Sequence, residues 1–192
     1  MEHLLFVDAC LRGADSRTLR LCNVWLEEYR RRCPDGVIEH VSLAQMAPLP
    51  LRADDLARRD LLVSQGHLND PMLAPAVQFA RADRILIGAP YWDLLFPAAL
   101  RAYLEQICVC GIAFHYTEHG SEGLCRAKKL DYLTTAGGFI GENNFGFDYI
   151  QGLCALLGIP ETACAYAEGL DIIGMDTDAQ MAEGVERVRA LF

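Results

Sequence analysis

The sequence predicts one α/β domain built on a doubly wound, five-stranded parallel sheet with helices on both faces. Short apolar runs typical of strands alternate along the chain with longer segments whose apolar residues recur at helical spacing. Three of these runs are apolar enough to be central strands of a parallel sheet, which needs helices on both faces. The 192 residues suit a single domain over 1–192, because no repeat, low-complexity tract or long linker interrupts the alternation.

The individual elements follow from their hydrophobic period and from the residues at their ends. An apolar stripe from Leu19 to Tyr29 indicates a long helix after the first strand, "HLLFVDA". Pro71 and Pro97 stand where later helices are expected to begin. The predicted strands are 3–9, 36–43, 84–90, 128–138 and 159–169, and the predicted helices are 16–32, 53–66, 72–82, 97–110, 143–157 and about 178–191.

The composition excludes several classes of partner. The formal net charge is -9, so we expect no nucleic-acid partner, because binding to nucleic acid needs clustered cations. The most apolar stretch, 85–100, is interrupted by Asp93 and two prolines, and a bilayer span needs about 20 mostly apolar residues. We therefore expect no membrane segment. Glu2 and the lack of a basic leader favour a cytoplasmic protein. The eight cysteines form no Cys-x-x-Cys pair, and we expect no metal site.

The turn after the first predicted strand has the composition of an anion site. Residues 8–21 read "DACLRGADSRTLRL", which puts Arg12, Ser16, Arg17 and Thr18 at the start of a helix. The free N–H groups and the positive dipole end of a helix favour a phosphate there, and the two hydroxyls would complete its ligands. The simpler alternative is that Ser16 only caps the helix, which accounts for neither Arg12 nor Thr18.

Known phosphate-binding patterns do not match this turn. It is neither a Walker A sequence nor a G-x-G-x-x-G turn, so it does not indicate ATP or a Rossmann-type dinucleotide. In a phosphatase loop, a Cys nucleophile is followed after five residues by an Arg. Counted from Cys10, that position is Ser16, and Arg17 comes one place later. A phosphatase is therefore a poor alternative.

Two more loops are expected at the same sheet edge, where ligands of open α/β sheets bind. Tyr91 and Trp92 follow the third strand, although alone they are better explained as core or interface residues. The fourth strand ends in "TTAGG", whose glycines allow either a close approach to a ligand or a tight turn. Together the three loops fit a phosphate at one end and a planar ring at the other, which is the shape of FMN. A flavodoxin-like sheet is the simplest topology.

The segment 89–138, "APYWDLLFPAALRAYLEQICVCGIAFHYTEHGSEGLCRAKKLDYLTTAGG", resembles the FMN-dependent NAD(P)H azoreductase and quinone reductase family. The resemblance spans about residues 3–170, and "GIAFHYTEHGSEGL" is its most specific part. It implies a flavodoxin-like homodimer with FMN at the subunit interface. It also implies a ping-pong mechanism: NADH or NADPH reduces the flavin and leaves, and a quinone, azo compound or similar flat acceptor then takes the two electrons.

The resemblance also implies which residues form the site. Tyr116 matches an aromatic residue that lines the substrate side, and His115 is a candidate proton donor, although exposed loop histidines are common. No further catalytic side chain is expected, because the flavin carries the hydride chemistry. The residues expected to bind the cofactor are Cys10, Arg12, Ser16, Arg17, Thr18, Pro90, Tyr91, Trp92, Asp93, Leu94, Thr135, Ala136, Gly137 and Gly138.

The chain departs from the family pattern at two places. The usual Met-Tyr-Asn-Phe is here the tetrapeptide 91–94, Tyr-Trp-Asp-Leu, and Ala136 stands where many relatives have Arg. We expect Asp93 to lower the flavin potential, since an anion opposes the charge gained on reduction. The alternative function is a flavodoxin-type electron carrier. The connection 111–123 with Tyr116 favours the enzyme, because a carrier needs an exposed flavin edge.

Overall fold

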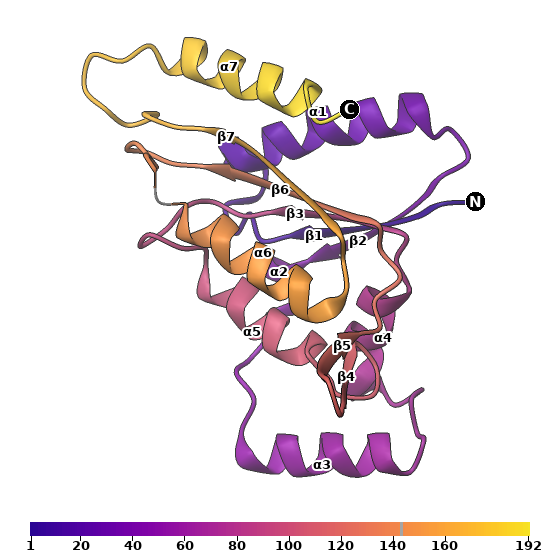
Figure 1. Cartoon of the computed structure of the whole chain (residues 1–192). Helices are drawn as coiled ribbons and strands as arrows, with labels where there is room; N and C mark the ends of the chain where they lie inside the picture. The colour runs from indigo at the N-terminus through magenta and orange to yellow at the C-terminus, as the bar shows by residue number, and fades with distance from the viewer. Residues whose placement is uncertain (143) are drawn as a thin grey trace.

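A computed structural model describes residues 1–142 and 144–192, and its main feature is a five-stranded parallel sheet (Figure 1). The spatial order is β2-β1-β3-β6-β7, so the predicted doubly wound, flavodoxin-like topology is confirmed. The central strands β1, β3 and β6 are buried along nearly their whole length, as their apolar sequences require. The strands span His3–Asp8 (β1), Val37–Ser42 (β2), Arg84–Gly88 (β3), Lys129–Thr135 (β6) and Glu161–Ala167 (β7).

Helices cover both faces of this sheet. Figure 1 shows α1 and α7 on one side and α4, α5 and α6 on the other. Alternate residues of β1 enter two cores: Leu4 packs on the α1 side, and Leu5 packs on the α5 side. The helices span Arg17–Arg32 (α1), Leu43–Met46 (α2), Ala53–Ser64 (α3), Ala74–Arg81 (α4), Ala98–Ile107 (α5), Phe145–Leu157 (α6) and Thr177–Arg189 (α7), and two 3-10 turns span Gly13–Asp15 and Pro71–Leu73.

Several predicted ends were wrong, mostly where the chain leaves the sheet. The strands predicted at 84–90 and 128–138 end at Gly88 and Thr135, because the residues that follow form loops. The helix predicted to reach residue 110 ends at Ile107, since Cys108 leaves the helical conformation. The helix predicted from residue 143 begins at Phe145; residue 143 itself lies outside the described residues.

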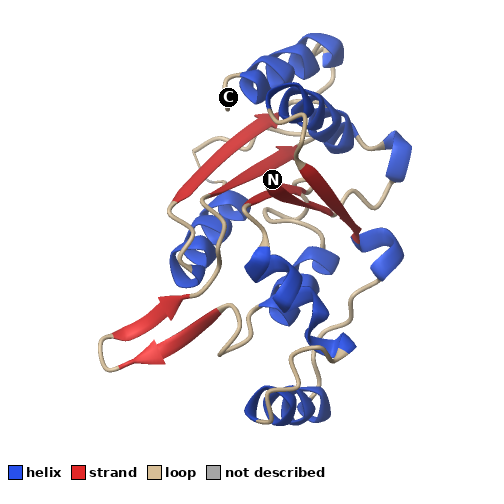
Figure 2. Ribbon diagram, turned by 90° about the vertical axis from the view of Figure 1, so that its right-hand side faces the viewer, coloured by secondary structure: helices blue, strands red, loops and turns tan. Residues whose placement is uncertain are grey.

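The sequence analysis missed a β-hairpin between α5 and β6. Its strands span Phe114–Thr117 (β4) and Gly120–Gly123 (β5), and Figure 2 shows it projecting from the rest of the molecule. Most of its residues are exposed, so it lacks the buried alternation by which strands are recognised. Gly123 lies so close to Gly158 that a Cβ would stand 2.0 Å from that residue's backbone nitrogen. This contact fixes the hairpin at the C-terminal end of α6.

None of the helices within the described ranges has both the length and the hydropathy needed to cross a membrane.

Candidate functional site

The three predicted loops meet around one cavity at the carboxyl edge of the sheet. Its volume is about 290 Å³. The loop after β7 contributes as well, because β7 lies beside β6 and ends at the same edge. The lining residues are Leu11, Arg12, Asp15, Ser16, Arg17, Thr18, Pro90, Tyr91, Trp92, Thr135, Ala136, Gly137, Leu170 and Asp171.

One end of the cavity is the N-terminus of α1. Ser16 is the N-cap, and its hydroxyl accepts a hydrogen bond from the Leu19 amide at 3.3 Å, as the capping alternative predicts. The cap satisfies only one donor, because the first amides of a helix have no partner inside it. Arg17 and Thr18 belong to this first turn and line the cavity together with Arg12. The structure therefore places cations and helix-end amides at one point, which suits an anion.

Arg17 is oriented by an acidic residue that the sequence analysis missed. Its Nη1 donates to Asp171 Oδ1 at 2.7 Å, and the Asp171 amide donates to the Gly137 carbonyl at 2.9 Å. A Cβ on Gly137 would stand 2.4 Å from Asp171 Oδ2, so a side chain there would push this carboxylate out of its present position. Four lining residues belong to no recognisable motif and were not predicted: Leu11, Asp15, Leu170 and Asp171. Leu170 and Asp171 could have been found from their position, because the loop after the fifth strand leaves the same edge of the sheet.

Thr18 and Thr135 join the helix to the sheet beneath the cavity. Their hydroxyl oxygens lie 2.6 Å apart, and both side chains are buried. One hydroxyl donates and the other accepts, which satisfies both groups where water is excluded. This bond holds the first turn of α1 beside the end of β6, and so sets the distance between the anion end and the loop that begins at Ala136.

The loop after β3 forms the other end of the cavity. The Tyr91 amide donates to the Thr135 carbonyl at 2.9 Å, which ties this loop to the end of β6. Burial raises the pKa of the Tyr91 phenol, with a smaller contribution from the Asp148 carboxylate, so the phenol is neutral at neutral pH. Asp93 and Leu94 have φ values of 51° and 68°, a conformation that is uncommon outside glycine and that marks a strongly constrained turn.

Some predicted site residues lie beside the cavity without lining it. Asp93, Leu94 and Gly138 are exposed at its mouth. The Cys10 thiol is buried and donates to the Gly88 carbonyl at 3.6 Å, so it faces the sheet and not the cavity. The Cys10 amide donates to Asp8 Oδ1 at 2.8 Å. Cys10 therefore supports the loop from below, and this placement also disfavours the phosphatase alternative.

His115 and Tyr116 are not brought to the cavity of their own chain. Both belong to β4 in the hairpin, where His115 Nε2 lies 3.2 Å from Glu122 Oε2 and Tyr116 is 73% exposed. The hairpin contacts the C-terminal end of α6, whereas Gly137, which lines the cavity, comes before the N-terminal end of this helix. A helix of 13 residues is about 20 Å long. Within one chain these two residues therefore lie away from the cavity, and their place on the substrate side stays a prediction.

Comparison with known proteins identifies the family. A family model described as "Flavodoxin-like fold" matches residues 2–192. The FMN-dependent NADH:quinone oxidoreductase 2 of Clostridium acetobutylicum is 35% identical over 196 residues, which cover 98% of this chain and 97% of the relative. The chain belongs to the flavodoxin-like family that contains these quinone oxidoreductases. A second flavodoxin-like relative, the FMN-dependent NADH:quinone oxidoreductase of Clostridium beijerinckii, is 33% identical and covers 98% of this chain and 97% of its own length.

Solved structures of this flavodoxin-like fold agree. An azoreductase from Bacillus anthracis strain Sterne superposes with a TM-score of 0.87 at 22% identity, covering 100% of this chain and 98% of that one. The FMN-dependent NADH-azoreductase of Bacillus anthracis strain Ames Ancestor, solved in complex with FMN, gives a TM-score of 0.84 at 19% identity over 100% of this chain and 97% of that one. At these identities the likeness shows the fold.

The buried hydroxyl pair predicts a coupled effect on stability. Thr18→Val leaves the Thr135 hydroxyl buried without a partner, and we expect it to lower the free energy of unfolding by about 1–3 kcal/mol. Adding Thr135→Val removes the second hydroxyl as well, so the double variant should regain most of this loss. Urea denaturation without added flavin measures both values. Strictly additive losses in the double variant would contradict the pairing.

Proposed function

We propose that this protein is an FMN-dependent NADH oxidoreductase that reduces quinones, azo compounds or similar flat acceptors by two-electron transfer. The observation that carries the proposal is one cavity that joins a cationic helix N-terminus to an aromatic loop. Relatives at 35% and 33% identity over nearly their whole length carry the name FMN-dependent NADH:quinone oxidoreductase. A cytoplasmic location, expected from the sequence, stays a prediction.

The residues at the anion end fit the phosphate of FMN. The first turn of α1 gives this end a partial positive charge, Arg12 adds a full charge, and Arg17 adds a charge that it shares with Asp171. Arg17 is held by Asp171 and its side chain remains 37% exposed, so its guanidinium is accessible to a phosphate oxygen. The Ser16 hydroxyl accepts the cap hydrogen bond from Leu19 and keeps its own proton, which it can donate to a phosphate oxygen.

The loop end fits a planar ring system that lies partly on the surface. The cavity of about 290 Å³ is at the small end of the range for ligand sites. It would hold the phosphate and the polar chain, and Tyr91, Trp92 and Gly137 would contact the ring. When bound, FMN supplies hydride chemistry between NADH and the acceptor. The protein supplies binding, orientation and electrostatics. Gly137 matters here because its backbone, without a side chain, lets a ring approach.

The hairpin does not cover the cavity of its own chain, so it does not exclude an electron carrier. Residues 111–123 were expected to cover the flavin, which would favour an enzyme, but in a single chain the hairpin lies at the other end of α6. A carrier with an exposed ring edge is therefore compatible with the isolated chain. The enzyme is preferred because the relatives are named as oxidoreductases.

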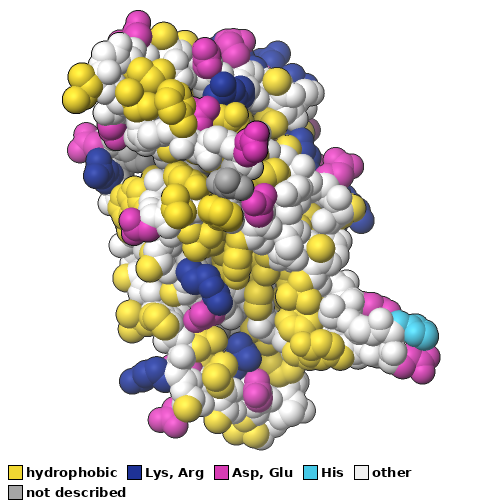
Figure 3. Space-filling model, turned by 60° about the vertical axis from the view of Figure 1, so that its left-hand side comes forward, with side chains coloured by type: hydrophobic (Ala, Val, Ile, Leu, Met, Phe, Trp, Pro, Cys, Tyr) yellow, Lys and Arg dark blue, Asp and Glu magenta, His cyan; other side chains and the backbone are white. Residues whose placement is uncertain are grey.

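A homodimer with the site at its interface would complete the active site. Figure 3, which brings the carboxyl edge of the sheet towards the viewer, shows apolar side chains gathered on this face. Trp92, Leu94, Phe139 and Phe145 are exposed there by 37%, 63%, 64% and 47%. Adjacent exposed apolar side chains of this size mark a binding surface. A second copy seated on this face can cover the ring and bring its hairpin, with Tyr116, towards the site.

The reductive half-reaction tests the proposed function. Purified protein with FMN should show a bound flavin spectrum that bleaches when NADH is added without oxygen, and a small quinone should restore it. Steady NADH oxidation with the quinone should need no second protein. A flavin that binds but stays oxidised with both NADH and NADPH would identify the carrier. Failure to bind FMN would overturn the cavity assignment.

The role of Arg17 in binding the phosphate can be tested with a variant that removes its charge. Arg17→Gln should weaken FMN binding by about tenfold, since a charge-assisted hydrogen bond to phosphate is lost. Riboflavin, which lacks the phosphate, should bind the variant and the parent equally. Arg20→Gln, on the exposed side of α1, removes the same charge and should leave both affinities unchanged.

Asp93 should depress the flavin potential. Asp93→Asn removes a negative charge beside the ring, so the midpoint potential should rise; an unchanged or lower potential would contradict the prediction. Asn tolerates the positive φ of this position, so the loop should keep its shape. Spectroelectrochemical titration measures the potential, and Asp54→Asn on the distant helix α3 is the control with the same change in charge.

The proposed interface predicts that the oligomer depends on the apolar face. Phe139→Lys should weaken the dimer, measured as a higher dissociation constant by sedimentation equilibrium, because it places a charge in a buried apolar contact. Leu61→Lys on α3 changes a side chain that is 55% exposed and should leave the dimer intact. If only Leu61→Lys dissociates it, the interface lies on the other face.

A further inference from the structure

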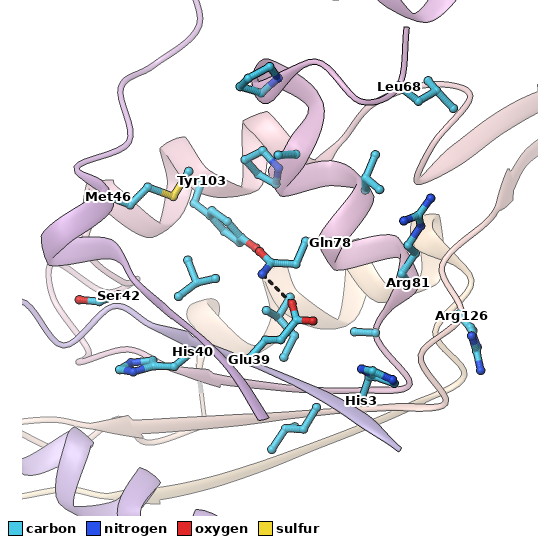
Figure 4. A pocket seen from close by; sticks show the side chains of 18 of the residues that line it. His3, Glu39, His40, Ser42, Met46, Leu68, Gln78, Arg81, Tyr103 and Arg126 are labelled. Carbon is cyan, nitrogen blue, oxygen red and sulfur yellow. Dashed lines mark hydrogen bonds between the residues drawn. The ribbon is translucent and has the colours of Figure 1, made fainter. Parts of the chain in front are cut away.

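A second and larger cavity lies away from the proposed flavin site. Its volume is about 1160 Å³, and it forms a groove between the edge strand β2 and helix α4, with α5 at its base. Figure 4 shows this groove with Met46 and Ser42 at one end and Arg81, Arg126 and His3 at the other. Since β2 has no further strand beside it, the groove opens along the edge of the sheet.

The base of the groove holds a polar group without a partner. Tyr103 is fully buried, and its hydroxyl makes no hydrogen bond to any described residue. In Figure 4 the Tyr103 side chain points towards Gln78 and Glu39, which lie across the groove. A buried hydroxyl without a partner costs free energy in the folded protein, and a ligand with an acceptor at this point would remove that cost.

Polar groups lie at the middle of the groove, and arginines lie at one of its ends. At its middle, Gln78 Nε2 donates to Glu39 Oε2 at 2.7 Å and joins α4 to β2. Beyond this pair, Arg81 lies one turn further along α4, exposed and without an ion-pair partner in the described part of the chain. Arg126 is already paired with Asp83 at 2.9 Å. Arg81 is therefore the cation available to a ligand.

Apolar side chains form the walls between these polar points. Val41 of β2, Leu68, Pro71 and Pro75 all line the groove. Small-molecule sites combine mostly apolar walls with a few polar groups that fix orientation. Such walls favour a flat hydrocarbon body. The Tyr103 hydroxyl as a donor and the Glu39 carboxylate as an acceptor favour a ligand hydroxyl that both accepts and donates, and Arg81 favours a carboxylate.

We propose that the groove is a second ligand site, for an aromatic carboxylate that carries a hydroxyl group. The hydroxyl oxygen accepts from Tyr103 and its proton is donated to Glu39, while the carboxylate faces Arg81. The proposal does not rest on the flavin site, because none of the groups that carry it lines that cavity.

Calorimetric titration with 6-hydroxy-2-naphthoate tests the site, using protein saturated with FMN so that the other cavity is filled. We expect saturable binding of one molecule per chain. Tyr103→Phe should weaken binding by about fivefold to tenfold through the lost hydrogen bond, and it should not lower Tm, because the hydroxyl has no protein partner to lose. Arg81→Gln should weaken the binding of 6-hydroxy-2-naphthoate by about tenfold but leave the affinity for 2-naphthol, which lacks the carboxylate, unchanged.

Matched variants separate this site from others. Arg30→Gln changes an exposed arginine on α1 and should leave the affinity unchanged. Absence of saturable binding, or binding that both groove variants leave intact, would overturn the proposal. A probe that binds the protein without FMN but not the FMN-saturated protein, and that Tyr103→Phe still binds, would lie on the flavin loops. This result would also overturn the proposal. A lowered Tm in Tyr103→Phe would show that the hydroxyl is part of the protein's own packing.

Discussion

The parallel register of the central strands is the constraint on which the candidate site depends. Asp8 at the end of β1 is paired with Gly88 at the end of β3, and Gly88 is paired with Leu133 near the end of β6. Three loops therefore leave the sheet within a few residues of one another. Parallel strands need long crossovers, which the helices supply, and those helices bury both faces of the sheet. The cavity lies at the carboxyl ends of the strands, which these helices do not cover.

Local contacts then turn the edge into a defined shape. The Thr18 and Thr135 hydroxyls fix the helix to the sheet, and the amide of Tyr91 fixes one loop to the next. Asp171 orients Arg17 from a fourth loop. Each bond joins elements far apart in the sequence, so none of the loops has its shape by itself. This explains how a turn without a phosphate-binding motif still presents amides and cations to one point.

The sequence predicts the features that burial or neighbouring residues determine, and it does not predict those that depend on contacts between distant parts of the chain. The central strands were recognisable because burial on both faces makes them continuously apolar, and Arg12, Arg17 and Thr18 were found because they precede a long helical stripe. Cys10 was misplaced because spacing does not tell on which side of the chain a side chain lies. The hairpin was missed because exposed strands carry no buried period, and Asp171 because its role depends on Arg17, 154 residues away.

An acidic chain that binds anions requires short-range electrostatics. The formal net charge of -9 repels phosphate at a distance, but at physiological ionic strength charges separated by more than about 8 Å are largely screened. The charges that remain effective are those at the cavity, where Arg12 and the amides of α1 are positive and Arg17 is paired with Asp171. Affinity for a phosphate then depends on contact geometry and not on the overall charge. The same reasoning applies to the groove, where Arg81 acts alone because Asp83 already neutralises Arg126.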